Sequence, residues 1–285
     1  LVDVNDDYGA LPYDTYTIEE LKCDANSDKA LYKGKIKISR DNYTVDMGTI
    51  ENPDVTITTN AKDAATNSHY ANPDGSVTII DNVSYTGLKK SKTYTLNGIL
   101  MNQKTKEPLL DQNGNPITAT KDFKPKTAEG SVEVEFTFDA RGLDLTNVTV
   151  FEECYLGDVF ITDHKDINSE QQTIHFPSIH TTAKDSKTET NISMADGKVK
   201  LYDTVSFENV KKNETYLLKA RLMDQDTGKI LKDCNGNEIT AEKEFKAEST
   251  SGTVDVVFEF DGSNLAGKKT VVFEKLTKDG KVYAK

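Results

Sequence analysis

Polar side chains that could do chemistry fall on the apolar faces of predicted strands in the middle of this chain. The residues concerned are Thr59, Asp81, Glu152 and Gln172. Asp81, for example, shares a strand face with Ile79 and Val83 when side chains alternate with a period of two. This placement is informative, because a buried polar group needs a reason whereas a buried aliphatic group does not.

The two acids, Asp81 and Glu152, are predicted to be buried carboxyl groups. Burial of an ionised carboxylate is costly, so such a group raises its pKa and takes up a proton. Two buried acids that lie close together could share one proton. A second interpretation is that each acid only accepts hydrogen bonds from backbone amides at a bulge or a strand end.

A histidine, His164, lies eight residues before Gln172. A hydroxyl, an imidazole and a carboxyl group are the parts of an activated nucleophile. A glutamine amide is an acyl donor whose leaving group is ammonia. If Thr59 faced Gln172, its hydroxyl could attack the amide and leave an internal ester.

Part of this pattern returns later in the chain. Thr181, Asp203 and Glu274 repeat Thr59, Asp81 and Glu152 at a constant offset of 122 residues. The offset indicates a domain duplication, because the units of solenoid proteins are only about 20–50 residues long. We therefore assign residues 54–176 to a first repeat and residues 177–285 to a second.

Both repeats are predicted to be all-β. Residues 131–138 and 253–260 alternate polar and apolar side chains, as half-buried strands do. Asn113-Gly114 and Asn235-Gly236 are typical hairpin turns, and no segment has a sustained helical period. Many short strands in each repeat favour tandem immunoglobulin-like antiparallel β-sandwiches.

Residues 1–53 match neither repeat. Strands are expected near Ile36–Ser39 and Tyr43–Val45, and the segment is short for an independent β domain. We interpret it as the C-terminal part of an upstream β domain. Both ends of the sequence are expected to lie within a longer protein that carries the signal peptide and the anchor.

Composition excludes several classes of function. The 285 residues include 35 basic and 47 acidic side chains, a formal net charge of −12. This charge disfavours nucleic acid or anionic lipid as the main partner. No run of about 18 apolar residues exists, so membrane insertion is not expected.

Metal and disulfide chemistry is not expected either. The three cysteines, Cys23, Cys154 and Cys234, are an odd number without metal-ligand spacing. We therefore predict neither a metal nor a cofactor. The remaining histidines, His69, His175 and His180, are expected at the surface.

The residues of the first repeat carry a specific resemblance. The stretch from Ile57-Thr58-Thr59 through Val150-Phe151-Glu152 to His164 and Gln172-Thr173 resembles the ester-bond (VaFE-type) immunoglobulin-like repeats of Gram-positive surface adhesins. The resemblance covers all of the first repeat and most of the second.

The resemblance implies a role for each polar residue. A threonine in the first strand of such a repeat joins a glutamine in the last strand through an autocatalytic ester bond. Thr59 would be the nucleophile, Gln172 the acyl donor and His164 the general base. Asp81 and Glu152 would polarise the amide carbonyl and stabilise the oxyanion.

Thr58 is the second candidate nucleophile, but two arguments favour Thr59. Thr59 lies on the apolar face of its strand. It also precedes Asp81 by 22 residues, as Thr181 precedes Asp203.

The second repeat is expected to be incomplete within this sequence. The counterparts of His164 and Gln172 would be positions 286 and 294, but the sequence ends at Lys285. Thr181 would therefore be unpaired, with Asp203 and Glu274 beside it and the last strand missing. The open edge could accept a strand from another chain.

The segment before the repeats is similar to the end of a CnaB-type domain, in its Leu11-Pro12-Tyr13 and Tyr16–Glu20 stretches. In that family a glutamate assists a Lys–Asn isopeptide bond, which makes Glu20 a candidate. The lysine-bearing strand is not in this sequence, so no isopeptide bond is predicted.

The sequence favours three classes of function to different degrees. The favoured class is a structural stalk of an extracellular, cell-wall-anchored adhesin or pilus-like protein. The chain is expected to be monomeric, and a host ligand would be bound by another part of the parent protein. A ligand-binding module that contacts a host protein or glycan is the alternative. A hydrolase is disfavoured, because its nucleophile would be consumed in a single turnover.

Overall fold

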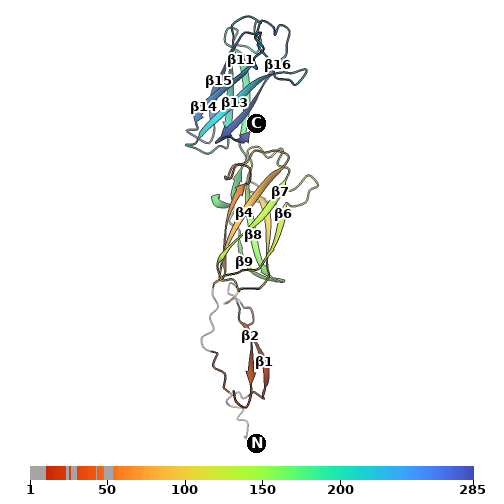
Figure 1. Ribbon diagram of the computed structural model, residues 1–285, viewed down its shortest axis with the longest axis vertical. Coiled ribbons are helices and arrows are strands. Elements are labelled where there is room, and N and C mark those ends of the chain that lie inside the picture. The colour runs from red at the N-terminus through yellow and green to blue at the C-terminus, as the bar shows by residue number, and fades with distance from the viewer. Residues whose placement is uncertain (1–10, 24–25, 27–30, 43, 48–53) are drawn as a thin grey trace.

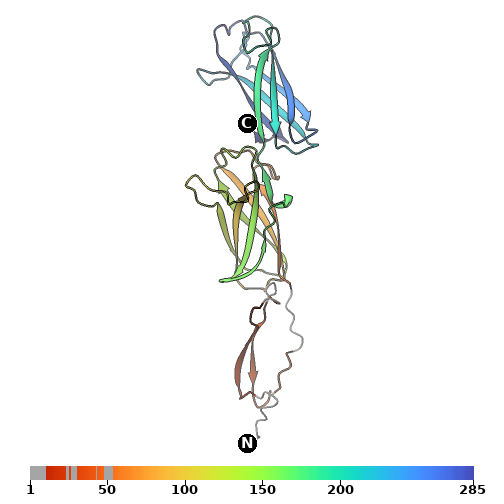
Figure 2. The same cartoon turned by 180° about the vertical axis from the view of Figure 1, so that it is seen from behind.

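The structure is a computed structural model that describes residues 11–23, 26, 31–42, 44–47 and 54–285. Two β-sandwiches follow a short N-terminal part, and the three parts lie end to end along the long axis of the molecule (Figures 1 and 2). The prediction of an all-β chain with tandem antiparallel sandwiches is therefore confirmed. No helix in the described ranges is long and apolar enough to cross a membrane.

The first sandwich consists of two antiparallel sheets. One sheet has the order β3-β4-β7, with strands β3 (Thr56–Asp63), β4 (Val77–Thr86) and β7 (Gly130–Phe138). The other has the order β10-β8-β5-β6, with strands β10 (Thr173–His175), β8 (Asn147–Leu156), β5 (Tyr94–Asn102) and β6 (Thr118–Phe123). A further strand, β9 (Val159–His164), also pairs with β8.

The outer edge of β8 is shared by two short strands. β10 pairs with the beginning of β8, where Thr173 lies opposite Thr149. β9 pairs with its end, where His164 lies opposite Glu152. A single 3₁₀ turn, η3 (Glu170–Gln172), leads into β10. Val150 and Phe151 therefore lie in a gap between the two edge strands.

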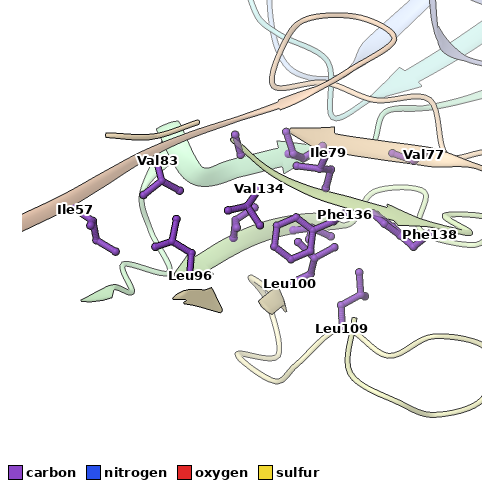
Figure 3. Packing of buried hydrophobic residues seen from close by; sticks show 14 of the residues in the cluster. Ile57, Val77, Ile79, Val83, Leu96, Leu100, Leu109, Val134, Phe136 and Phe138 are labelled. Carbon is purple, nitrogen blue, oxygen red and sulfur yellow. The ribbon is translucent and has the colours of Figure 1, made fainter. Parts of the chain in front are cut away.

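The core of the first sandwich lies between the two sheets, as the period-two alternation predicts. Val134 and Phe136 of β7 are buried against Leu96 and Leu100 of β5 (Figure 3). Between β5 and β6 the chain turns at Asn113-Gly114, and Gly114 has a φ of 82°, which favours glycine. The predicted turn is confirmed.

The second sandwich repeats this architecture. One sheet has the order β11-β12-β15, with strands β11 (Ser178–Asp185), β12 (Val199–Glu208) and β15 (Gly252–Phe260). The other has the order β14-β13-β16-β17, with strands β14 (Thr240–Lys246), β13 (Thr215–Asp224), β16 (Thr270–Lys278) and β17 (Lys281–Ala284). β17 corresponds to the first part of β9.

The described N-terminal residues form a hairpin of β1 (Asp14–Glu19) and β2 (Lys33–Ile38), in which Tyr16 lies opposite Ile36. β2 includes most of the strand expected near Ile36. Thr44 and Val45 are not in a strand, so the second expectation is wrong for these residues, and Tyr43 lies outside the described residues. Glu20 accepts hydrogen bonds from the side chain of Asn26 and the backbone of Tyr32.

The two sandwiches are in contact through polar and aromatic side chains. Asn209 of the second sandwich donates to Asn147 Oδ1 at 3.0 Å and to the Phe176 carbonyl at 3.2 Å. His175 is buried beside this junction and stacks on Tyr70. Its expected surface position is therefore wrong, because Tyr70, Asn147 and Glu170 contact the ring.

Candidate ester cross-link site

Thr59 lies on the inward face of β3. Its side chain is 2% exposed, whereas Thr58 points to solvent from the same strand. β3 is an edge strand, and it lies against β9, η3 and β10 of the opposite sheet. Thr59 is therefore positioned at the opening between the two sheets, where a covalent bond could join them.

His164 contacts Thr59 from the end of β9. The backbone N–H of Thr59 donates to His164 Nδ1 at 3.2 Å, and Thr59 Oγ1 lies 3.3 Å from the same nitrogen. Because a backbone N–H can only donate, Nδ1 must carry its lone pair toward Thr59. This nitrogen can accept the proton of the Thr59 hydroxyl, as a general base must.

The side chain of Gln172 fills the gap in the β8 edge. Its amide nitrogen donates to the Val150 carbonyl at 2.7 Å and to the His164 carbonyl at 3.2 Å. Both N–H groups of the amide are thus used, and the side chain is fully buried. The sequence predicts Gln172 on a strand face, whereas it lies in η3. The contact with Val150 is not predictable from its side chain, because the backbone carbonyl accepts the hydrogen bond.

The carbonyl oxygen of Gln172 is buried without a hydrogen-bond partner among the described residues, and so are both carboxyl oxygens of Glu152. Asp81 and Glu152 are both fully buried, from β4 and β8 respectively. The two acids need a proton, because an unpaired buried acceptor is costly.

Burial and mutual proximity place a proton on this acid pair. Burial, and then the nearby Asp81, raises the pKa of Glu152 to about 9. Burial raises the pKa of Asp81 to about 7, although the Asn60 backbone and the Thr59 hydroxyl oppose the shift. Near neutral pH, Glu152 therefore holds a proton that it can donate to a developing oxyanion.

The arrangement has the parts required for acyl transfer from an amide to a hydroxyl. In such a reaction the bond from Thr59 Oγ1 to the Gln172 amide carbon would form, and the bond from that carbon to Nε2 would break. The hydroxyl proton would pass to His164 Nδ1 and then to the leaving nitrogen, which would depart as ammonia. The buried carboxyl groups of Glu152 and Asp81 could neutralise charge in the core.

Comparison with known families agrees with this geometry. Residues 55–176 and 177–285 each match the family described as "T-Q ester bond containing domain". The chain belongs to this family. The two T-Q ester bond domains correspond to the two sandwiches.

A comparison with curated protein sequences found no relative. Among solved structures, the chain is similar to a bacterial adhesin from Mobiluncus mulieris that contains intramolecular disulfide, isopeptide and ester bond cross-links. The two are 13% identical with a TM-score of 0.37, and the match covers 77% of this chain and 80% of that one. The C-terminal domain of the Streptococcus agalactiae AgI/II polypeptide BspA is 10% identical, with a TM-score of 0.37, over 81% of this chain and 98% of that one.

The second T-Q ester bond domain has the same threonine and acids, with Thr181 and Glu274 beside a groove and Asp203 fully buried. Thr181 is exposed and its hydroxyl donates to Asp203. Burial and the nearby Asp203 carboxyl raise the pKa of Glu274 to about 9. Thr181 and Glu274 line a groove with a volume of 370 Å³. The positions equivalent to His164 and Gln172, 286 and 294, lie beyond the 285 residues of the sequence.

Proposed function

We propose that this chain is part of the load-bearing stalk of a Gram-positive surface adhesin or pilus-like protein, and that its first sandwich carries an autocatalytic ester between Thr59 and Gln172. His164 acts as the general base, and Asp81 with Glu152 acts as the acid pair. The reaction occurs once per molecule, because it consumes both the threonine and the glutamine.

The observation that carries this proposal is the position of the two partners in the path of the chain. Thr59 is in β3, the first strand of the sandwich, and Gln172 directly precedes β10, the last. β10 ends at His175 and β11 of the next sandwich begins at Ser178. A pulling force would thus pass from β3 through the ester to β10, and the strands between them would bear no load.

The junction between the sandwiches supports a role as a rod. Lys281 donates to the Thr66 carbonyl at 2.9 Å, in addition to the two hydrogen bonds of Asn209. These contacts connect the two domains on more than one side of the linker. The parent protein would be located at the cell surface and anchored in the cell wall. A host ligand would be bound by another part of the protein.

Single-molecule extension of the chain tests the stalk function. The ester encloses 113 residues, since 172 − 59 = 113. At about 3.6 Å per residue, these residues would add roughly 400 Å of contour length if they could unfold. We expect this step to be absent in the wild-type chain and present in Thr59→Val. Unfolding of the second sandwich is the internal control in both. A full-length step for the first sandwich in the wild-type chain would contradict the proposal.

A further inference from the structure

A glycine lies at a core-facing position directly opposite one of the two acids. Gly98 occupies the middle of β5, between the buried Leu96 and Leu100, and pairs with Glu152 across the ladder. A glycine inside a strand weakens it and often marks a place where another group approaches closely. The glycine between apolar residues on one strand face is the signal for this position in the sequence.

The reason for the glycine is space. A Cβ atom added to Gly98 would lie 2.4 Å from Glu152 Oε1 and 2.4 Å from Cζ of Phe136. Gly98 is not among the residues with positive φ, so its backbone conformation does not require glycine. The Glu152 carboxyl and the Phe136 ring, which lies against β5 in Figure 3, occupy the volume that a side chain would fill.

The second sandwich has a methyl group at this position. Ala220 is the counterpart of Gly98 and pairs with Glu274 in the same register. Phe258, the counterpart of Phe136, is also buried. The strand accepts the alanine, so the fold tolerates a methyl group at this position. Glu274 is 7% exposed and Glu152 is 0% exposed, but Glu274 also lines a groove that has no equivalent beside Glu152 in the described part of the chain.

We propose that Gly98 is a positioning residue for ester formation, because its missing side chain leaves the space in which the Glu152 carboxyl lies fully enclosed beside Asp81. A side chain at this position moves the carboxyl away from its partners and leaves the strand in place. The inference rests on the proposed ester and adds a residue that does not touch the reacting atoms.

The test is the rate of ester formation in Gly98→Ala, measured as loss of one ammonia from the denatured protein with time after refolding, over a range of pH. We expect formation at least tenfold slower than in the wild type, with the alkaline limb of the pH–rate profile shifted toward lower pH. The shift would follow because a more exposed Glu152 loses its proton more easily. A purely structural defect would not move this limb.

Two further variants keep the inference falsifiable. Gly98→Ala combined with Phe136→Leu relieves the contact with the ring and leaves the contact with the carboxyl. The slow rate and the shifted limb should persist in this double variant. Ala220→Gly, the matched control in the other sandwich, should form the first ester at the wild-type rate.

The outcomes are distinct. Wild-type rate and profile in Gly98→Ala, or recovery of both in the double variant, would overturn the role of Gly98 while the ester itself stands. Absence of ammonia loss from the wild-type protein would instead overturn the proposed function. If Gly98→Ala failed to fold and the double variant folded and reacted normally, ring packing would be the only role of the glycine and the inference would be wrong.

Discussion

The amide group of Gln172 takes the place of a missing strand partner, because it donates at 2.7 Å to the Val150 carbonyl in the gap between β9 and β10. This contact and the one to the His164 carbonyl use both N–H groups of the amide and restrict its orientation. The reacting group is thus held in one orientation before any covalent bond forms, which is the condition for a fast intramolecular reaction.

Removal of the nucleophile should abolish the cross-link. Thr59→Val keeps the shape of the side chain and loses the hydroxyl, so the denatured protein should have the full mass of its sequence. Thr58→Val is the matched control, because Thr58 is exposed on the opposite face of β3. The control should still lose one ammonia. Equal masses of the two denatured variants would show that Thr59 is not the nucleophile.

Removal of the proposed base, His164, should slow ester formation more than it affects folding. His164→Ala removes the nitrogen that lies 3.3 Å from Thr59 Oγ1. General-base catalysis contributes about 10²–10⁴-fold, and we expect ester formation to slow by this factor. Refolding and mass spectrometry with time measure it. His180→Ala, which changes an exposed histidine of the second sandwich, is the control, and an unaffected rate in His164→Ala would remove the assigned role.

The acid pair should give the reaction an alkaline limit. Burial raises the pKa of Glu152 to about 9, so the rate should fall when the pH exceeds this value and the proton is lost. Glu152→Gln should lose this limb and react about 10²–10³-fold more slowly, the usual effect of removing one donor to an oxyanion. A Glu152→Gln variant with the wild-type profile would show that the proton comes from elsewhere.

The same acids make the stability of the unlinked domain depend on pH. Both have folded-state pKa values, about 7 and about 9, above their ordinary values of 3.8 and 4.5. The folded state therefore binds more protons, and stability present at pH 4 is lost as the pH rises toward 9. Chemical denaturation of Thr59→Val should show this decline. Adding Asp81→Asn and Glu152→Gln to this variant should remove most of the pH dependence. Stability of Thr59→Val that does not change with pH would contradict the pKa shifts.

Much of the site could be predicted from the sequence, because the period of two assigns Thr59, Asp81 and Glu152 to inward faces without reference to distant residues. Gln172 could only be assigned in part. Its place in η3 and its contact with Val150 depend on where two edge strands end against β8, which is a nonlocal property. The burial of His175 could not be predicted for the same reason, because Tyr70 and Asn147, which contact its ring, come from distant parts of the chain.

In the polypeptide of residues 1–285, the groove beside Thr181 and Glu274 should accept an added strand. A synthetic peptide of Ile161–Phe176 includes the histidine and the glutamine of the first domain. It should bind in the groove beside Thr181 and become joined to it. The adduct should resist denaturant and be absent in Thr181→Val. An adduct that persists in this variant, or none at high peptide concentration, would contradict a split ester site.

The ester should also contribute to stability by restricting the unfolded chain. On the entropy model used for disulfides, closure of a loop of 113 residues, from 172 − 59, contributes about 4–5 kcal/mol. Thr59→Val should be less stable than the wild type by an amount of this order in denaturant titrations at pH 5, where the acid pair is protonated. A difference well below 1 kcal/mol would show that the cross-link is not a structural staple.

The central claim is tested most directly by the intact mass of the denatured wild-type polypeptide of residues 1–285. The account predicts a mass lower than that of the sequence by one ammonia and not by two, because only the first domain contains a threonine, a histidine and a glutamine at the required positions. Fragmentation should place the linkage between Thr59 and Gln172. A wild-type mass equal to that of the unmodified sequence would contradict the account.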